Sequence, residues 1–377
     1  MNRVAFVTGG TGLLGSWLAR TLIDSGYRKV YILVRGGSKR FEHKRSVPSH
    51  FQARWQVSKE RALDFSGYDG KAEILKGDIC KRNLDLSTHA LRSLRDEVTD
   101  VFHSAAIADF RIPLNIIRIP NVEGTRNVCR LILSISRTSG RKVRMHQIST
   151  VGIAGTLQGW FSENDFDKGQ GFHNPYERTK FEAEKIVTGY RSQGLSATIY
   201  RPAVITGDSR LGATTNFKMF YQPLHFLALG LFKKFPAEAE CLHSLVPVDK
   251  VAYAIALLSG LPEPPCNAWH LVNPNETSVG DFFEVASRVF GFKKPALIPF
   301  ESFPRTGLSP VQWNLIKPFV PYFNYHVRFR ATETNNMLRL FGFSWPEAGR
   351  PMLAKLFHYC IQCGYIRPKV SALLKAG

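Results

Sequence analysis

Two side chains capable of acid–base chemistry stand four residues apart in the segment NPYERTK, residues 174–180. If this segment is helical, Tyr176 and Lys180 lie on one face, because residues i and i+4 are neighbours on a helix surface. A free tyrosine has a pKa near ~10, and a nearby ammonium group lowers that pKa toward the range of a general acid or base. The spacing therefore predicts that Tyr176 transfers a proton and that Lys180 assists it.

A pair of hydroxyl residues upstream adds weight to this prediction, because a lone Y-x-x-x-K spacing is common by chance. The segment ISTVGIAG, residues 148–155, puts Ser149 and Thr150 at the end of a run that is typical of a buried strand. A hydroxyl at a strand end can reach the same pocket as the helix. We predict that Thr150 orients and polarises a carbonyl oxygen, so the predicted catalytic residues are Thr150, Tyr176 and Lys180.

The opening stretch VAFVTGGTGLLG, residues 4–15, contains the pattern of a phosphate-binding turn. Gly9, Gly12 and Gly15 are three residues apart, an apolar run precedes them, and an amphipathic stretch follows over residues 13–25. Glycines allow the backbone to approach a pyrophosphate, which the free N–H groups and the dipole of a helix N-terminus favour. A tight structural turn uses the same residues, but the strand before and the helix after favour dinucleotide binding.

The second apolar run ends in ILVRGGSKR, residues 32–40, and its end indicates which nicotinamide cofactor binds. NAD-selective enzymes place an acid at this strand end for the ribose 2′-hydroxyl, whereas Arg35 suits a 2′-phosphate. The sequence therefore predicts NADPH. Lys39 and Arg40 are candidates to assist, although the basic run 39–45 is more typical of a solvated loop.

Two further strand ends add candidate cofactor contacts. Asp78 in LKGDI is placed to accept a hydrogen bond from the adenine amino group, and the small residues of FHSAA, residues 102–106, allow a ribose to lie close. Both segments also suit a simple tight strand end. The predicted cofactor-binding residues are Thr8, Gly9, Gly12, Leu13, Leu14, Gly15, Arg35, Asp78, Ile79, Ser104, Ala105, Ala106, Lys180, Arg201, Pro202 and Val204, and no metal site is predicted.

Strand-like and helix-like segments alternate through the first two-thirds of the chain. Apolar runs begin near residues 4, 29, 72, 100, 143 and 196, and amphipathic stretches such as 122–136 lie between them. This is the pattern of successive βαβ units in a right-handed parallel sheet. We predict an α/β fold, a Rossmann-type doubly wound parallel sheet with a smaller, mostly helical C-terminal substrate lobe.

The remaining chain is expected to supply that lobe. Residues 217–232 are rich in aromatics and leucine, which suits an acyl tunnel or an interfacial helix and equally suits plain lobe core. AWHLVNP, residues 268–274, is typical of a strand, which we expect to rejoin the first domain. We assign residues 1–205 and about 246–274 to the NADP-binding domain, and about 206–245 and 275–377 to the substrate-binding lobe.

Charge and cysteine content limit the partners and the compartment. The 50 basic and 30 acidic residues give a net charge of +20, which suits a polyanionic partner and equally a generally basic solvated surface. The six cysteines do not form a disulfide or zinc pattern, and the C-x-x-C at Cys360 and Cys363 is interpreted as packing. No apolar run approaches the ~20 residues of a spanning helix, so a soluble, cytoplasmic protein is expected.

Taken in order, these motifs resemble the extended short-chain dehydrogenase/reductases, and within them the thioester-reductase and fatty acyl-CoA reductase branch. The resemblance rests on TGGTGLLG, LVR, GDI, FHSAA, NVEGT, ISTVGIAG, NPYERTK and IYRPAVITGDSRLG, and covers Val4 to about Pro274. It implies that Thr150, Tyr176 and Lys180 are catalytic and that Arg35 contacts the 2′-phosphate. Residues 201–212 lie where the chain of this family crosses toward the substrate lobe.

The resemblance implies an NADPH-dependent reductase of an acyl thioester, which yields an aldehyde or an alcohol. The acyl group is expected on coenzyme A or on an acidic acyl carrier protein, with no nucleic acid partner and with peripheral membrane contact left open. One alternative is an extended short-chain enzyme that acts on a ketone, a hydroxyl or a nucleotide-sugar, because a fold does not fix a reaction. A non-catalytic NADP-binding protein is the other alternative.

Overall fold

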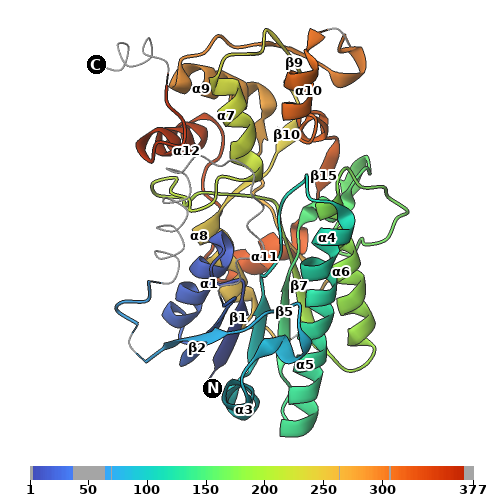
Figure 1. The fold of residues 1–377 in the computed structure, drawn as a ribbon, viewed down its shortest axis with the longest axis vertical. Coiled ribbons are helices and arrows are strands. Elements are labelled where there is room, and N and C mark those ends of the chain that lie inside the picture. The colour runs from blue at the N-terminus through green and yellow to red at the C-terminus, as the bar shows by residue number, and fades with distance from the viewer. Residues whose placement is uncertain (1–2, 37–63, 69, 263, 305–306, 369–377) are drawn as a thin grey trace.

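A seven-stranded parallel sheet forms the centre of the computed structural model, which describes residues 3–36, 64–68, 70–262, 264–304 and 307–368. The strand order is β12-β7-β5-β4-β1-β2-β3, and every neighbouring pair is parallel (Figure 1). The strands are β1 (Val4–Thr8), β2 (Lys29–Val34), β3 (Ala72–Lys76), β4 (Asp100–His103), β5 (Arg144–Ile148), β7 (Ser196–Pro202) and β12 (Trp269–Leu271). The predicted Rossmann-type doubly wound sheet is confirmed, and residues 268–274 do contribute its edge strand.

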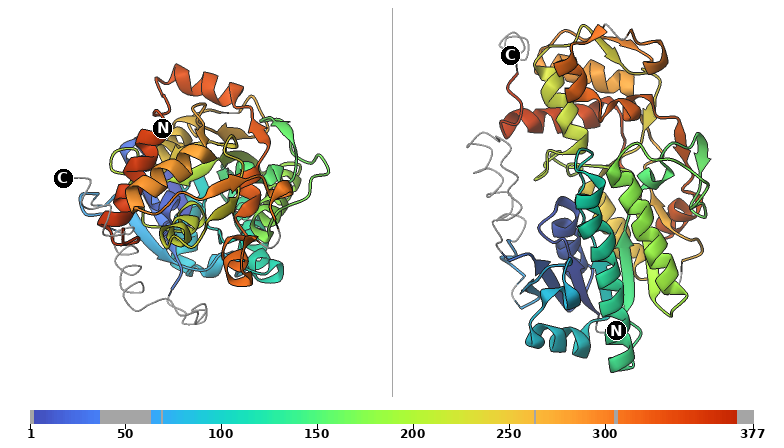
Figure 2. Two further views of the ribbon diagram at one scale, coloured as in Figure 1. Left: turned by 90° about the horizontal axis from the view of Figure 1, so that it is seen from above. Right: turned by 45° about the vertical axis from the view of Figure 1, so that its right-hand side comes forward.

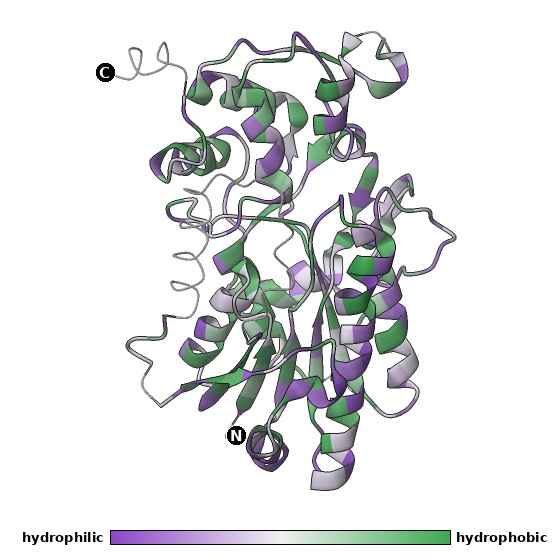
Figure 3. Ribbon diagram, viewed as in Figure 1, coloured by the Kyte–Doolittle hydropathy of each residue, from purple (hydrophilic) through white to green (hydrophobic). Residues whose placement is uncertain are grey.

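Helices bury both faces of this sheet. One face carries α1 (Leu13–Asp24), α8 (Val248–Leu258) and α11 (Thr332–Leu340), and the other carries α3 (Thr88–Glu97), α5 (Gly124–Ser139) and α6 (Pro175–Arg191). Successive side chains of a strand point to opposite faces, so Val7 packs under α1 while Phe6 packs under α5. Burial on both faces explains why the central strands β1 and β2 are apolar along most of their length (Figure 3).

The lobe sits above the carboxyl ends of the strands (Figures 1 and 2). It contains the helices α7 (Gln222–Ala228), α9 (Val279–Phe290), α10 (Pro310–Ile316) and α12 (Arg350–Gln362), the turn η8 (Val320–Asn324) and the parallel pair β9 (Lys234–Pro236) and β14 (Ala296–Ile298). Phenylalanines dominate its core, and Phe235, Phe283 and Phe357 are fully buried. Cys360 is buried in the same core, and neither it nor Cys363 is in a disulfide bond.

Short strands and one helix join the lobe to the sheet. β8 (Val204–Thr206) pairs with β11 (Leu245–Pro247), and β6 (Gly159–Phe161) pairs with β15 (Val327–Phe329). Two shorter strands, β10 (Leu242–His243) and β13 (Thr277–Ser278), and helix α4 (Leu114–Arg118) lie near the same junction. Helix α11 falls within the segment 275–377 that the sequence assigned to the lobe, yet its Leu338 packs in the hydrophobic cluster of the sheet. No helix within the described ranges is long and apolar enough to cross a membrane.

The glycines after β1 allow three backbone segments to touch. Gly9 has φ +76°, and a Cβ on it would lie 2.6 Å from the backbone nitrogen of Ala105 in the loop after β4. A Cβ on Gly15 would lie 2.2 Å from the carbonyl oxygen of Gly9. Gly9 and Gly15 are therefore required by the close packing of β1, α1 and the loop after β4. Ligand binding alone does not explain the glycine spacing.

Gly9→Ala is expected to destabilise the protein more than Gly26→Ala. Gly26 also has a positive φ, +92°, but a Cβ added to it would meet no atom within 4 Å. Both substitutions carry the cost of a left-handed backbone, about 1–2 kcal/mol, and Gly9→Ala adds a backbone collision. Thermal unfolding of both variants measures the difference. Equal losses of Tm would contradict the packing role assigned to Gly9.

Candidate active site

A cavity of about 280 Å³ lies between the carboxyl edge of the sheet and the lobe. Its sheet-side wall begins at the N-terminus of α1, passes the ends of β4 and β5, and reaches the first turns of α6. Eleven of the predicted site residues lie together in this wall: Gly12, Leu13, Leu14, Gly15, Ser104, Ala106, Thr150, Tyr176, Lys180, Pro202 and Val204. The strand ends therefore bring the glycine loop and the predicted catalytic side chains to one cavity.

Tyr176 occupies the second position of helix α6. Asn174 caps this helix by accepting a hydrogen bond from the backbone N–H of Glu177 at 3.1 Å, and Pro175 fills the first helical position. Burial raises the pKa of Tyr176 well above its ordinary value, and the neighbouring Glu177 carboxylate raises it further. The phenol is therefore protonated at neutral pH and available as a proton donor.

Lys180 lies one turn further along α6 and is almost fully buried. Its Nζ donates to the carbonyl oxygen of Ile148 at 2.6 Å. Burial lowers the pKa of Lys180 to about 8, against a smaller opposing effect of Glu184. The expected net lowering of the Tyr176 pKa is wrong for this structure, because burial of the phenol outweighs any effect of the Lys180 ammonium group, which donates to a backbone carbonyl.

Thr150 lies just beyond the end of β5 in an extended conformation. Its Oγ1 accepts a hydrogen bond from the backbone N–H of Gly152 at 3.1 Å. The N–H occupies the oxygen as acceptor and leaves the hydroxyl proton to donate to a ligand. The neighbouring Ser149 is 4 % exposed, lines the same cavity, and its Oγ has no partner within the described residues.

The lobe contributes a second wall that sequence reasoning missed. Tyr322, Tyr325, His243 and Glu276 all line the cavity, and the Tyr325 hydroxyl is buried without a hydrogen-bond partner among the described residues. These residues are 67 or more positions from Tyr176 along the chain and follow no recognisable motif. Only the predicted aromatic stretch 217–232 gave a signal, and Met219, Phe220 and Tyr221 from it do line the cavity.

A buried carboxylate ties this second wall to helix α6. Glu177 is 1 % exposed and accepts from the hydroxyl of Tyr322 at 2.5 Å on Oε1. Its Oε2 accepts from the backbone N–H and the ring of His173 at 2.8 and 3.1 Å. The side-chain amide of Asn174 donates to the same Tyr322 hydroxyl. The lobe is therefore hydrogen-bonded to the cap of the helix that carries Tyr176.

Arg201 is a structural residue rather than a cavity residue, which corrects the sequence interpretation. It is 1 % exposed and holds Glu184 of α6 with contacts of 2.8 to 3.2 Å. Side chains alternate along β7, so Arg201 faces α6 while Pro202 faces the cavity. Thr8 is likewise fully buried, and its Oγ1 contacts His103 Nδ1 at 2.7 Å and accepts from the backbone N–H of Ala105.

The remaining predicted cofactor residues lie outside this cavity wall. Arg35 is exposed just after β2. Its positive charge acts on the thiol of Cys80 and partly offsets the rise in the pKa of that thiol that burial causes. Asp78 accepts from the backbone N–H of Cys80 at 2.9 Å. Arg35 and Asp78 therefore lie just beyond the carboxyl ends of the neighbouring strands β2 and β3. Gly9, Ala105 and Ile79 act through packing, and Lys39 and Arg40 lie outside the described residues.

The N-terminus of α1 fits the pyrophosphate of a dinucleotide. Its cap is Gly12, which offers no side chain to the first N–H groups, and the first turn contains no acidic residue. Free N–H groups and the helix dipole attract a phosphate at such a terminus. Gly12 and Gly15 line the cavity beside Ser104 and Ala106, so the sheet edge is open to a ligand there. Within the described ranges, no group of three His, Cys, Asp or Glu side chains could hold a metal ion.

The parallel sheet, the glycine turn and the Thr150, Tyr176 and Lys180 set define an NAD(P)-binding oxidoreductase of the extended short-chain dehydrogenase/reductase type. A family model described as "Male sterility protein" matches residues 7–255. The chain belongs to this family, and the resemblance found in its sequence is confirmed.

Individual relatives are reductases and synthetases of greater length. The chain is 32% identical over 319 residues to the adenylate-forming reductase Nps9 of Serpula lacrymans, covering 81% of this chain and 27% of that protein. It is 24% identical over 387 residues to a linear gramicidin synthase of Brevibacillus parabrevis, covering 97% of this chain and 7% of that protein. The chain thus spans about a quarter or less of the length of these two relatives.

A solved structure supports the fold over nearly the whole chain. The terminal R domain from the myxalamid PKS-NRPS biosynthetic pathway superposes with a TM-score of 0.78 at 24% sequence identity, covering 97% of this chain and 93% of that one. The segment after Pro274, which the sequence motifs did not cover, is therefore part of a known architecture.

The buried state of Lys180 predicts a pH dependence. With a pKa of about 8, the ammonium group is charged at neutral pH and loses its proton as the pH rises through that value. Because kcat/KM reports the free enzyme, it is expected to fall about tenfold per pH unit above this point. A profile measured by nicotinamide oxidation and flat from pH ~7 to ~9.5 would contradict a role for charged Lys180.

Proposed function

We propose that this protein is an NADPH-dependent reductase of acyl thioesters. The observation that carries the proposal is the single cavity in which Thr150, Tyr176 and Lys180 meet the N-terminus of α1. The relatives support the thioester, because the chain aligns over most of its length with an adenylate-forming reductase at 32% identity and with a gramicidin synthase at 24% identity. We propose that the acyl group arrives on a carrier protein or on coenzyme A.

NADPH is favoured over NADH by the charge at the end of β2. Arg35 is exposed beside Cys80 at the strand end where an acid would bind the 2′-hydroxyl of NAD. A guanidinium pairs with a phosphate through two parallel hydrogen bonds. The sequence prediction of NADPH therefore stays our proposal.

The bound dinucleotide supplies a hydride to the carbonyl carbon of the thioester. Thr150 donates its free hydroxyl proton in a hydrogen bond to the carbonyl oxygen and polarises it. Tyr176, kept protonated by burial, gives its proton to that oxygen as the charge develops. Lys180 provides a buried positive charge that stabilises the resulting phenolate. The product of this step is a hemithioacetal.

The hemithioacetal then loses its thiol. Its C–S bond breaks, the oxygen returns its proton as the carbonyl reforms, and the sulfur leaves as a protonated thiol. The net reaction consumes one thioester, one NADPH and one proton and gives one aldehyde, one thiol and NADP⁺. A second hydride transfer to the aldehyde gives an alcohol by the same proton route through Tyr176.

Thiol release tests this proposal. A thioester reductase must expel the carrier sulfur, whereas a ketone or nucleotide-sugar enzyme with the same three residues expels nothing. Incubation with acyl-coenzyme A or acyl-carrier thioesters and NADPH is expected to release one thiol per NADPH if reduction ends at the aldehyde, and one per two if it continues to the alcohol. A parallel series with NADH is expected to run more slowly.

The control series offers keto, hydroxy and nucleotide-sugar compounds to the same protein. Turnover of one of these, with no thiol from any thioester, would contradict the proposed function and favour the alternative reaction class. Equal rates with NADPH and NADH would remove the role proposed for Arg35 while leaving the thioester reaction intact.

A further inference from the structure

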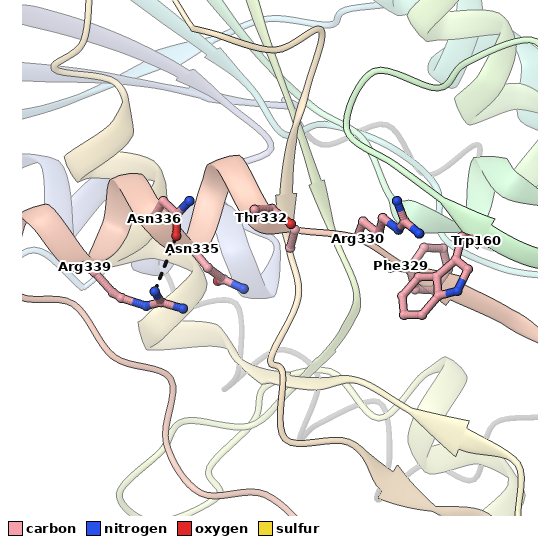
Figure 4. Close-up of a pocket in the computed structure, with 8 residues that line it drawn as sticks. Trp160, Phe329, Arg330, Thr332, Asn335, Asn336 and Arg339 are labelled. Atoms are coloured by element: carbon pink, nitrogen blue, oxygen red, sulfur yellow. Dashed lines mark hydrogen bonds between the residues drawn. The ribbon is translucent and has the colours of Figure 1, made fainter.

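An open groove of about 450 Å³ is lined in part by Phe329. Trp160 of β6 and Arg330, just after β15, form one wall, and Asn335, Asn336 and Arg339 of helix α11 form the other (Figure 4). Phe329 lines both this groove and the catalytic cavity. The groove is therefore directly adjacent to the cavity and opens to solvent.

The groove carries positive charge without a matching acid. Arg330 and Arg339 both line it, and neither forms an ion pair within the part of the chain that the structure describes. None of the eight residues that line the groove is acidic. Many other described arginines do pair with carboxylates, including Arg118 with Glu182 and Arg350 with Asp281.

The arginines are also held in position. The guanidinium carbon of Arg330 lies 5.1 Å from the ring centre of Trp160, a side chain that is 59 % exposed. Stacking on an aromatic ring limits the rotamers of an arginine and leaves its N–H groups free at the edge. Arg339 donates to Oδ1 of Asn336 at 3.4 Å, and both residues belong to helix α11. The two arginines lie at opposite ends of the groove, Arg330 beside Trp160 and Arg339 beside Asn336 (Figure 4).

We propose that this groove binds the phosphate at the end of the pantetheine arm of the thioester substrate. The inference rests on the proposed function, because coenzyme A and acyl carrier proteins present their acyl group on the same phosphopantetheine unit. An arginine binds phosphate through charge-assisted hydrogen bonds, and the groove offers one such side chain at each end. A phosphate held outside Phe329 leaves the thiol end of the arm directed toward the cavity that contains Tyr176.

The test compares acyl-4′-phosphopantetheine with acyl-pantetheine, which differs only in lacking the phosphate. In the unaltered protein, the phosphate is expected to raise kcat/KM about tenfold or more. Arg330→Gln and Arg339→Gln are each expected to lower this ratio of kcat/KM values toward one. Arg130→Gln is the matched control, since Arg130 is an exposed arginine of α5 outside the groove, and it is expected to keep the ratio.

Acyl-coenzyme A and an acyl-carrier protein are run in parallel, because both contain this phosphate. Loss of kcat/KM on both substrates in the groove variants supports the assignment, and loss on acyl-coenzyme A alone would mean adenylate binding and overturn it. A ratio of one in the unaltered protein, or an unchanged ratio in both groove variants, also overturns it while leaving the thioester reaction in place. Failure to turn over any thioester would instead refute the proposed function.

Discussion

The hydrogen bonds of Glu177 hold together the two halves of the site. This buried carboxylate immediately follows Tyr176, accepts from Tyr322 of the lobe, and shares that hydroxyl with Asn174, the cap of helix α6. Burying a carboxylate is costly unless its oxygens are hydrogen-bonded, and both oxygens are satisfied only when the lobe and α6 are in register. The position of Tyr176 therefore depends on the position of the lobe.

The rest of the architecture brings the other reacting groups to the same place. In a parallel sheet all carboxyl ends meet at one edge, where ligands of open α/β folds bind. Ser104 and Thr150 lie at the ends of β4 and β5, and the turn after β1 places the N-terminus of α1 beside them. Close backbone contact between Gly9 and Ala105 sets how near these strand ends can lie. Buried pairs such as Arg201 with Glu184 then fix α6 against β7.

Local sequence patterns predicted the strands and the site residues that depend on neighbours in the chain. They failed for the side chains whose surroundings depend on tertiary contacts. Apolar runs predicted the parallel sheet, and the Tyr176 to Lys180 spacing with the β5 end predicted three residues that do line one cavity. Arg201 was misassigned because a one-residue step along β7 turns its side chain from the cavity to Glu184. Tyr322 and Tyr325 could not be found, because they reach the site through the fold of a lobe that carries no motif. The division of the chain into two domains and the catalytic roles stay predictions.

In the proposed reaction, the Tyr176 phenol supplies the proton while other residues hold the cofactor. Tyr176→Phe removes only the hydroxyl, and Tyr190→Phe, on the same helix but outside the cavity, is its matched control. General acid catalysis contributes about 10²- to 10⁴-fold. Tyr176→Phe is expected to lose turnover by that order in single-turnover reduction, while its NADPH affinity stays within about twofold of the control. A Tyr176→Phe variant that reduces its substrate at a near-normal rate would contradict this role of Tyr176.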